Sequence, residues 1–498
     1  MPDILLATVN ARYIHSSLGL RCLLANLGDL RPRAALKEFR VKQPAEEIAE
    51  QILKKAPKIL GLGVYIWNVQ RTAEIVDIIR QKSPKITIVL GGPEASFEAE
   101  HQTVVKRADF VIQGEGDLAF AQLCRDLLAG KRPSARIIQA EPCALDELKF
   151  PYDTYKPEDI AHRVIYVEAS RGCAYRCEFC LSALETAPRY FQTVAFLEEM
   201  QRLLDRGARH FKFVDRTFNH DLERAEKILR FFLNRSPHDT FLHLEAVPHR
   251  FPESFCRLLG EFPPGSLQLE IGFQTLNPEV SERIGRRYSV EKALKTLSHL
   301  RRDTHAYLHT DLIAGLPGED LDSFARGFDR LLAAGPHEIQ VGILKRLRGA
   351  PIRRHSREWG MVYREEAPYD LIQNRLMDAA TMQQLNRFAR FWDRTFNSGR
   401  FPNLVPLIWR DEASPFFAFW SWSAWASDHF GRDHSIPLDE LTRALTQYLK
   451  EVRGLPPEAV ETAQRNDRPI RRPQRHPSSV PYLKRQRRHL ESGIESDR

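Results

Sequence analysis

The 498-residue sequence is poor in cysteine, with seven residues, and in methionine, with five. So few cysteines exclude a disulfide framework and favour a reducing cytoplasm. Long apolar runs are also missing: the longest, such as KILGLGVYIW at 58–67, have the length of a strand and not of a membrane span. The N-terminus MPDILLATVN has no basic segment, so we expect no signal peptide.

A large charge of one sign is absent from most of the chain. The net charge is +8, but the residues from Arg465 onward carry ten Lys and Arg against four Asp and Glu. The basic pI therefore reports the C-terminus and does not indicate that the folded body binds nucleic acid. We expect residues 461–498, with repeated Pro among Arg and Ser, to be a disordered basic tail that is solvated, with contacts to acidic partners or RNA as the alternative.

Strand-like and helix-like segments alternate through the first 120 residues. Five apolar runs are typical of strands: 3–9, 35–41, 59–67, 86–92 and 108–114. Buried strands joined by helical crossovers form a parallel sheet that is covered on both faces. We therefore predict an α/β protein that begins with a flavodoxin-like, doubly wound parallel sheet over 1–137, followed by a linker over 138–160.

A second series of strands and helices begins near Val164. Its predicted strands are 164–170, 210–218, 240–247, 267–274, 306–316 and 338–344. Six parallel strands suffice for a partial (βα)6 barrel over 161–360, whose chemistry lies at the carboxyl ends of the strands. We expect a helical domain over 361–460. We interpret its aromatic run at 414–430 as part of the hydrophobic core, and a cover over the barrel mouth is the alternative.

Three of the seven cysteines, Cys173, Cys177 and Cys180, form a C-x3-C-x2-C loop directly after the first predicted barrel strand. A structural zinc site takes four ligands, usually in two separated pairs, whereas the other cysteines here are scattered. Three thiolates with an open fourth position suit a [4Fe–4S] cluster with one iron left free for a cofactor or substrate. A structural metal knuckle is the alternative.

With Phe179 before its last cysteine, this loop resembles the motif of the radical S-adenosylmethionine (SAM) superfamily, and the resemblance covers roughly 160–350. It implies that the three cysteines hold a [4Fe–4S] cluster and that SAM chelates the fourth iron. A one-electron reductant, such as a flavodoxin or ferredoxin, would then drive cleavage of SAM to a 5′-deoxyadenosyl radical. Arg171 and Arg176 beside the cysteines are expected to be solvated.

Further SAM contacts are implied by the resemblance at other strand ends. The segment FVDRTFN at 213–219 resembles the one that meets the SAM amino group, and the segments that follow resemble those near the ribose and adenine. The residues that this implies, in addition to Phe179, are Asp215, Thr217, Asn219, Glu245, Glu270, Gln274 and Gly315.

The N-terminal domain resembles the cobalamin-binding domain of one large radical SAM subgroup, through VYIWN (64–68), GGPEASFE (91–98) and VIQGEGD (111–117). Gly91 and Gly92 would allow the backbone to approach the macrocycle closely. The cobalt-ligating D-x-H-x-x-G pattern is replaced by NARYIHSSLG at 10–19, and we interpret His15 as a hydrogen-bonded loop residue. The implied cobalamin contacts are Tyr65, Trp67, Asn68, Gly91, Gly92, Glu94, Gly114, Glu115 and Gly116.

Together these resemblances imply a cobalamin-dependent radical SAM methyltransferase that acts on an unactivated carbon, in a poorly characterised group with an extra C-terminal helical domain. Methyl transfer from methylcobalamin, remade by SAM, would yield both 5′-deoxyadenosine and S-adenosylhomocysteine. Three alternatives remain open: a rearrangement or ring-forming enzyme, a methylthiotransferase-like enzyme, and a non-catalytic cobalamin or cluster sensor. The methylthiotransferase needs a second cluster, for which Cys22, Cys124 and Cys143 are poorly placed. The sequence names no substrate and indicates no specific nucleic acid.

Overall fold

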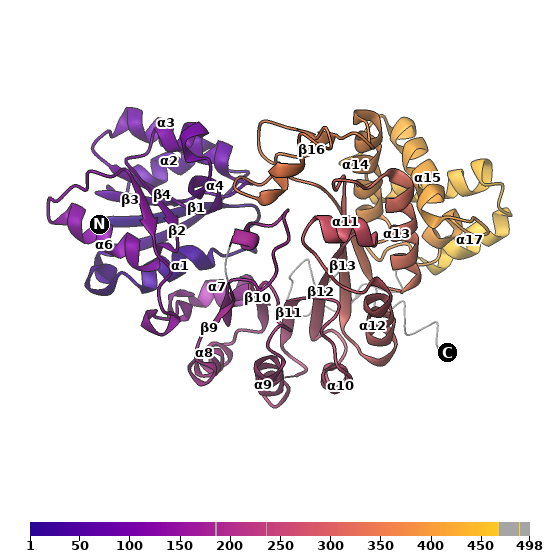
Figure 1. Cartoon of the computed structure of the whole chain (residues 1–498), viewed down its shortest axis with the longest axis horizontal. Coiled ribbons are helices and arrows are strands. Elements are labelled where there is room, and N and C mark those ends of the chain that lie inside the picture. The colour runs from indigo at the N-terminus through magenta and orange to yellow at the C-terminus, as the bar shows by residue number, and fades with distance from the viewer. Residues whose placement is uncertain (185–186, 236, 468–487, 489–498) are drawn as a thin grey trace.

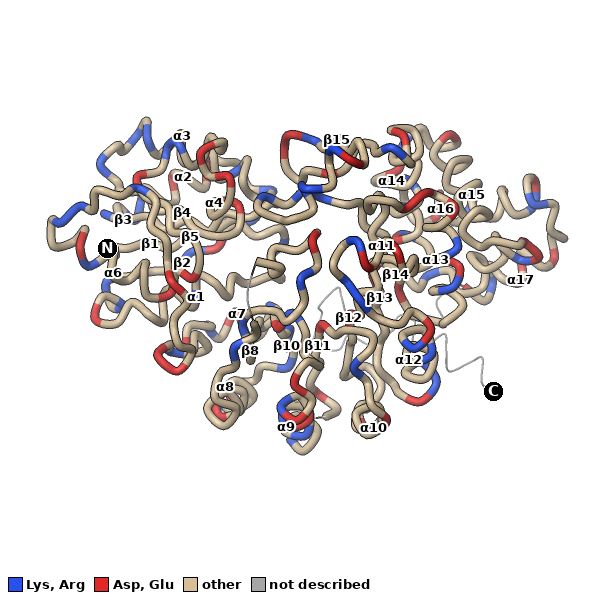
Figure 2. The backbone as a smooth tube through the Cα atoms, viewed as in Figure 1, with Lys and Arg blue, Asp and Glu red and all other residues tan. Residues whose placement is uncertain are grey.

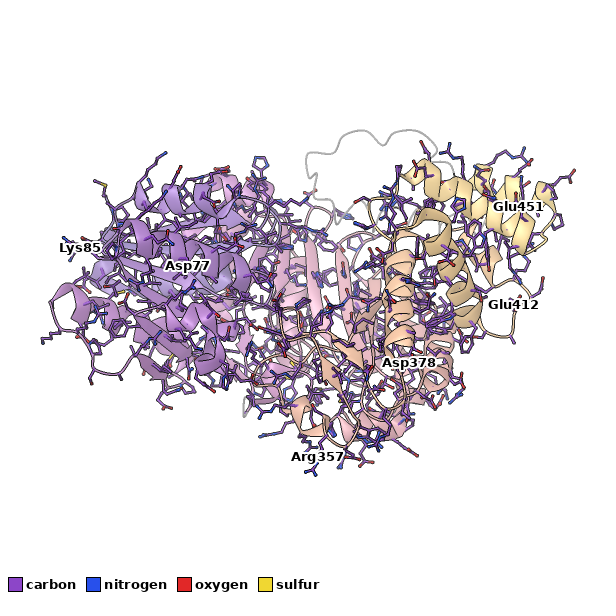
Figure 3. All side chains as sticks on the ribbon, turned by 90° about the horizontal axis from the view of Figure 1, so that it is seen from above. Asp77, Lys85, Arg357, Asp378, Glu412 and Glu451 are labelled. Atoms are coloured by element: carbon purple, nitrogen blue, oxygen red, sulfur yellow. The ribbon has the colours of Figure 1, made fainter. Side chains whose placement is uncertain are left out.

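The computed structural model describes residues 1–184, 187–235, 237–467 and 488. In Figure 1 an N-terminal unit lies on the left, a second strand-rich unit in the centre and a helical unit on the right. Charged side chains of both signs lie at the periphery, among them Asp77 and Lys85 at one end and Glu412 and Glu451 at the other (Figure 3). No helix within the described ranges is long and apolar enough to cross a membrane.

The N-terminal unit is built on a six-stranded parallel sheet in the order β2-β1-β3-β4-β5-β6. Every residue of β1 is buried, as expected for a central strand that is covered on both faces. The predicted flavodoxin-like fold is confirmed. The strands are β1 (Ile4–Asn10), β2 (Ala34–Arg40), β3 (Ile59–Gly63), β4 (Thr87–Gly91), β5 (Phe110–Gly114) and β6 (Ile137–Ala140).

Helices cover both faces of this sheet. One apolar cluster joins the sheet to α2 (Ala45–Leu53), α3 (Val69–Lys82) and α5 (Thr103–Lys106). A second cluster joins its other face to α1 (Leu18–Ala25) and α6 (Gly116–Leu128).

The structure differs from the sequence prediction at β6 and at the end of β3. β6 lies in the segment interpreted as a linker, because its residues alternate between exposed and half-buried and carry little apolar signal. As an edge strand it needs hydrogen bonds on one side only, and β5 supplies them. β3 ends at Gly63 and not near Trp67, because the Asn68 side chain accepts a hydrogen bond from the Tyr65 N–H (2.8 Å) and turns the chain.

The central unit is an open barrel of six parallel strands in the order β14-β13-β12-β11-β10-β7. β7 and β14 are not paired with each other, so the predicted partial (βα)6 barrel is confirmed. The strands are β7 (Ile165–Val167), β10 (His210–Phe213), β11 (Phe241–Ala246), β12 (Leu267–Gln274), β13 (Tyr307–Ala314) and β14 (Glu338–Ile343). The outer helices are α8 (Thr193–Asp205), α9 (Leu222–Leu233), α10 (Glu253–Gly260), α12 (Val290–Asp303) and α13 (Leu321–Ala333).

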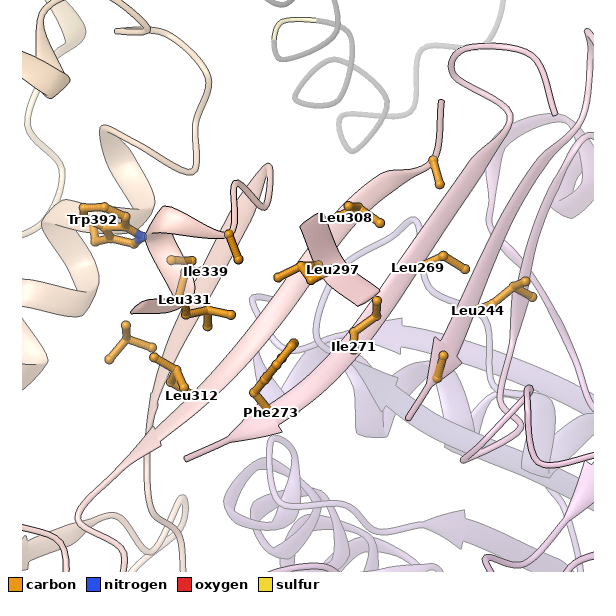
Figure 4. Packing of buried hydrophobic residues seen from close by; sticks show 14 of the residues in the cluster. Leu244, Leu269, Ile271, Phe273, Leu297, Leu308, Leu312, Leu331, Ile339 and Trp392 are labelled. Atoms are coloured by element: carbon orange, nitrogen blue, oxygen red, sulfur yellow. The ribbon is translucent and has the colours of Figure 1, made fainter. Parts of the chain in front are cut away.

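Alternate residues of the barrel strands point to opposite faces. Leu244, Leu269 and Leu308 belong to the apolar set that packs against the outer helices, where Leu297 of α12 and Leu331 of α13 meet them (Figure 4). Many of the intervening residues are polar, among them His243, Glu270 and His309, so polar side chains line the barrel interior.

The helical unit follows β14 and a small hairpin of β15 (Val362–Tyr363) and β16 (Leu371–Gln373). Its helices are α14 (Ala379–Arg394), α15 (Pro415–Phe430), α16 (Leu438–Gln447) and α17 (Pro457–Asn466). α17 extends the helical region beyond residue 460, so residues 461–466 are helical and not part of a tail. Apart from Asp467 and Arg488, the rest of the predicted tail lies outside the described residues.

The helical unit packs on the β14 side of the barrel. Asn397, just after α14, accepts a hydrogen bond from the Ile339 N–H and donates one to the Ile339 carbonyl, both at 3.0 Å. Its side-chain amide therefore pairs with the outer edge of β14 as a neighbouring strand would.

The aromatic run of α15 forms core, as the first interpretation held. Phe416, Phe419 and Trp422 are fully buried. The ring of Trp392 from α14 lies 4.9 Å from that of Phe419 and 4.8 Å from that of Phe328 on α13. These rings join the barrel to the helical unit.

Candidate active site

The C-x3-C-x2-C loop leaves the carboxyl end of β7 and is closed at its base by a short antiparallel pair, β8 (Ser170–Arg171) and β9 (Arg189–Tyr190). Gly172 opens the loop with φ +97°, and a Cβ there would lie 2.6 Å from the carbonyl oxygen of Ala187. Only glycine fits this conformation and this contact. The base of the loop is therefore fixed by the local sequence.

The environment of the three cysteines suits thiolate ligands. Cys177 is buried, and Cys173 and Cys180 are half-buried. The Tyr175 N–H donates to Cys173 Sγ (3.4 Å) and Arg286 Nη1 donates to Cys177 Sγ (3.3 Å). N–H donors aimed at cysteine sulfurs stabilise thiolates and tune iron–sulfur clusters, so this donor set fits such a group.

Arg286 is a site residue that the sequence did not reveal. Burial raises the pKa of Cys177, and the Arg286 guanidinium opposes that rise. The turn that carries Arg286 touches the cysteine loop, since Gly285 (φ +71°) has no room for a Cβ beside the Arg176 carbonyl. Arg286 also hydrogen-bonds the Gly272 carbonyl of β12. It is one of two adjacent arginines after a short helix, and nothing in the sequence distinguishes it.

Of the three candidates in FVDRTFN, only Thr217 faces a cysteine, with its Oγ1 3.7 Å from Cys173 Sγ. Asp215 is buried and accepts hydrogen bonds from the Ala169 N–H (3.0 Å) and the Ser170 hydroxyl (2.5 Å). Burial raises its pKa to about 6. Asp215 therefore holds the base of the cysteine loop, and we no longer assign it to SAM.

Asn219 also has a structural role instead of the expected one. Its Nδ2 donates to the carbonyls of Val247 (2.9 Å) and Arg250 (3.0 Å), and its Oδ1 accepts from the Val247 N–H (3.0 Å). The side chain is saturated and fixes the loop after β11, so we remove it from the SAM candidates as well. Phe179 is half-buried and packs against the barrel core.

Glu245 and Glu270 lie side by side in the barrel, because their strands pair at this position. The Glu270 carboxylate is 2.7 Å from His243 Nε2 and 3.6 Å from Lys212 Nζ. Burial acts to raise the pKa of Glu270, but the His243 hydrogen bond and the Lys212 charge hold it below its usual range. Burial and the nearby Glu270 charge raise the pKa of Glu245 to about 7.

Asp311 completes this acidic lining. One ligand atom from each of Glu270, His309 and Asp311 lies within 4.8 Å of the others. Burial raises the pKa of Asp311, although its hydrogen bond with His309 (3.2 Å) acts in the opposite direction. The barrel interior thus contains three carboxyl groups, those of Glu245, Glu270 and Asp311, together with the basic side chains of Lys212 and His309.

Gln274 and Gly315 end two neighbouring strands. Gln274 has φ +70°, a left-handed conformation that is rare outside glycine, next to an irregularity in the β12–β13 register. Gly315 has φ +90°, and a Cβ there would lie 2.4 Å from the Leu371 side chain. Gly315 is therefore required for packing against β16, whereas the strained Gln274 keeps its place among the site candidates.

At the end of β3, Tyr65 and Trp67 form a stacked pair with ring centroids 4.5 Å apart and an interplanar angle of 7°. The Trp67 side chain is 48% exposed, which leaves an aromatic surface for a ligand. Asn68 is buried, and its Nδ2 donates to the Val9 and Gly63 carbonyls. The Asn68 side chain therefore fixes the turn after β3.

The two glycines at the end of β4 differ in what the fold requires of them. Gly92 has φ +96°, and a Cβ there would lie 2.6 Å from the Val64 carbonyl oxygen, so the fold itself requires glycine. At Gly91 the nearest atom is 3.8 Å away, which a Cβ tolerates. Glu94 is buried and accepts a hydrogen bond from the Tyr369 hydroxyl (2.7 Å), so it contacts the barrel side of the molecule.

The end of β5 contacts the cysteine loop directly. Gly114 has φ +90° and no room for a Cβ beside Ala140, and Gly116 begins α6. Glu115 and Asp117 bind the Arg171 guanidinium at 3.2 and 2.9 Å. The expectation that Arg171 is solvated was therefore wrong, whereas Arg176 is exposed as expected.

His15 is a hydrogen-bonded loop residue, as interpreted from the sequence. Its Nδ1 lies 2.7 Å from the Tyr166 hydroxyl of β7. The loops after β1, β4 and β5 therefore all contact the barrel side, and the carboxyl ends of the first sheet face the mouth of the second. Such strand ends are where parallel sheets bind ligands.

Three family models match the chain. A B12-binding domain matches residues 4–124, the radical SAM superfamily matches 167–331, and a protein of unknown function (DUF4080) matches 357–467.

Curated relatives match across these domains. A 2-(S-pantetheinyl)-carbapenam-3-carboxylate methyltransferase from Streptantibioticus cattleyicolor is 25% identical over 59% of this chain and 48% of its own length. The cobalamin-dependent radical SAM methyltransferase TokK from Streptomyces tokunonensis is 24% identical over 60% and 49%. The chain thus spans about half the length of these relatives.

Solved structures share the fold. The cobalamin-dependent SAM radical enzyme OxsB with aqua-cobalamin and SAM has a TM-score of 0.65 at 13% identity, over 100% of this chain and 84% of that one. The radical SAM methyltransferase TsrM from Kitasatospora setae, with cobalamin and a [4Fe–4S] cluster, has a TM-score of 0.59 at 18% identity, over 74% and 76%. The domains imply their cofactors, a [4Fe–4S] cluster, SAM and cobalamin. The chain therefore combines an N-terminal B12-binding domain with a radical SAM superfamily domain.

Proposed function

We propose that this protein is a cobalamin-dependent radical SAM methyltransferase that acts on an unactivated carbon. The observation that carries the proposal is the direct contact between the cysteine loop and the end of β5, through Arg171, Glu115 and Asp117. This contact brings a three-thiol loop and a B12-binding sheet end to one place. A shared site of this kind suits a reaction that needs both groups.

In this proposal Cys173, Cys177 and Cys180 hold the cluster. When bound, the cluster and SAM supply a 5′-deoxyadenosyl radical, and cobalamin supplies a methyl carrier. The protein binds and orients these groups and excludes water from them. A one-electron reductant of the flavodoxin or ferredoxin class reduces the cluster.

The barrel interior suits SAM by its charge. SAM carries a sulfonium and an ammonium, and Glu245, Glu270 and Asp311 line the interior against Lys212. Arg286 stands beside the cysteines, where the SAM carboxylate is expected, and Gln274 and Thr217 offer polar atoms nearby. On the other side, the exposed Trp67 ring and Tyr65 offer a stacking surface to cobalamin.

The proposed function is tested on anaerobically prepared protein loaded with iron, sulfide and hydroxocobalamin. The loaded protein is reduced with a low-potential one-electron reductant and incubated with SAM that is labelled at its methyl group. We expect 5′-deoxyadenosine, S-adenosylhomocysteine and label in a light-sensitive cobalamin fraction. Formation of 5′-deoxyadenosine alone would favour the rearrangement or ring-forming class. Absence of both products would exclude an enzyme of either class, and protein without iron is the control.

Replacing Arg286 with glutamine is expected to weaken SAM binding by about tenfold or more, because a hydrogen bond to a charged group contributes roughly 1.5–3 kcal/mol. The matched control is Arg287→Gln, since the Arg287 side chain is 80% exposed and pairs with Glu282. SAM affinity is measured by titrating the EPR signal of the reduced cluster. Equal affinities for the two variants would remove Arg286 from the SAM site.

A further inference from the structure

A basic loop after β14, residues 344–359, crosses from the barrel to the B12-binding domain. Figure 1 shows this orange segment next to α4 (Pro93–Ser96), and Figure 2 shows its basic residues between the two units. We call it the bridging loop. It contains η6 (Pro351–His355) and the sequence LKRLRGAPIRRH at 344–355.

One end of the bridging loop binds the segment that follows β4. Arg346 binds both oxygens of the Glu98 carboxylate at 3.0 Å, and Arg348 binds Glu98 at 3.3 Å. Arg353 lies 3.6 Å from the same carboxylate. At Gly349 (φ +85°) a Cβ would lie 2.5 Å from the Phe97 ring, so the two backbones are in close contact.

Glu98 is itself held in an unusual conformation. Its φ of +50° is left-handed, which is uncommon for a residue other than glycine and persists where the surroundings fix it. Burial acts to raise its pKa, but Arg346 and the neighbouring arginines keep it below its ordinary value. The carboxylate is therefore a charged anchor at a fixed place in the B12-binding domain.

The other end of the bridging loop binds the cysteine loop at Glu178, which lies between Cys177 and Cys180. The Glu178 carboxylate accepts hydrogen bonds from Arg354 Nε and His355 Nε2, both at 2.8 Å. The Ile352 N–H donates to the Glu178 carbonyl at 2.8 Å. Glu178 and His355 are both buried, so their contact is shielded from solvent and is worth more than a surface pair, whereas the Arg354 side chain is 65% exposed.

A short, doubly anchored loop thus joins the segment after β4 to the segment that carries two of the three cysteines. Bidentate and buried ionic contacts restrict both ends, so a shift of the B12-binding domain moves the cysteine loop with it. The base of the cysteine loop is tied to the same domain through Arg171. The cysteine loop is therefore connected to the B12-binding domain at two places, at Glu178 and at its base.

We propose that the bridging loop is a positioning strut that sets the separation between the iron–sulfur cluster and cobalamin, with Glu98 and Glu178 as its anchors. This inference rests on the proposed function, because it needs both groups in one molecule. Glu98 is a positioning residue that acts through its contacts with the bridging loop.

The test measures magnetic coupling in the holoprotein, without turnover. Hydroxocobalamin in the loaded protein is reduced to cob(II)alamin together with the cluster, and the microwave power that half-saturates the cob(II)alamin EPR signal is recorded. The reduced cluster speeds cob(II)alamin relaxation with a steep dependence on distance. In Glu98→Gln, which keeps the side-chain shape and removes the charge, we expect this power to fall several-fold.

Three further variants make the test more specific. Glu100→Gln is the matched control, because Glu100 lies two residues away, is exposed and pairs with His101 instead of the bridging loop. Arg346→Lys keeps the charge that faces Glu98, so it is expected to retain most of the coupling that Arg346→Gln loses. Iron content, cobalamin content and thermal unfolding are measured for every variant to separate positioning from folding.

The outcomes distinguish this inference from the proposed function. Wild-type coupling in folded, fully loaded Glu98→Gln and Arg346→Gln would overturn the strut. An equal loss in Glu100→Gln would also overturn it, because the effect would then follow charge and not the contact. A wild-type protein that binds cluster or cobalamin but never both would overturn the proposed function instead.

Discussion

Replacing Cys177 with alanine is expected to abolish SAM cleavage, down to the level of protein without iron. Cys177 is buried, and its sulfur accepts a hydrogen bond from Arg286. Loss of one thiolate of three leaves the cluster with two protein ligands, and cluster stability depends on those ligands. We expect little iron, no visible absorption from a cluster and no EPR signal after reduction, with the fold retained in far-UV circular dichroism.

Cys256→Ala is the matched control for this experiment. Cys256 is also buried in the barrel unit, on α10, and its thiol donates to the Phe251 carbonyl at 3.7 Å. Burial raises the pKa of Cys256 to about 11, so it is an inert thiol. The cluster assignment fails if Cys177→Ala keeps the iron content and EPR signal that Cys256→Ala retains.

Trp392→Ala is expected to lower the free energy of unfolding by about 3–5 kcal/mol, the range for removing a large aromatic side chain from a core. Trp392 is fully buried, and its ring contacts those of Phe328 on the barrel and Phe419 on α15. The alanine variant leaves a cavity where the two units meet. Urea unfolding followed by near-UV circular dichroism measures the loss.

Trp392→Phe separates ring packing from the indole N–H. Nε1 of Trp392 has no hydrogen-bond partner among the described residues, so removing it costs no such bond. We expect a much smaller loss than in the alanine variant. If the alanine variant unfolds at the wild-type urea concentration, the aromatic cluster does not hold the barrel and the helical unit together.

Barrel strands with an apolar face against the outer helices could be predicted from the sequence. The run at 267–274 coincides with β12, and those at 306–316 and 338–344 match β13 and β14 within two residues at each end. These runs carry an apolar signal at alternate positions because helices cover one face of the strands. β6 could not be predicted in the same way, because an edge strand buries little and its residues carry little apolar signal.

The cysteine loop could be predicted from the sequence, but the residues that hold it in place could not. Asp215 and Asn219 lie at a strand end, where a ligand is expected, yet their oxygens and nitrogens bind the backbone of neighbouring loops. Periodicity shows where a strand ends and does not show whether a polar side chain there faces a ligand or a loop. Arg346 and Glu98 are 248 residues apart, so no local pattern links them.

The hydrogen bonds between the Asn397 side chain and β14 also protect the protein from aggregation with other chains. An open barrel leaves an unpaired strand edge, and such an edge is a template for joining with another chain. Asn397 satisfies both the N–H and the carbonyl of Ile339 on that edge, and α14 lies beside it. A fragment that ended after β14 would expose this edge together with the aromatic face of α13. The helical unit is therefore also a guard against aggregation, and the barrel is best expressed with it attached.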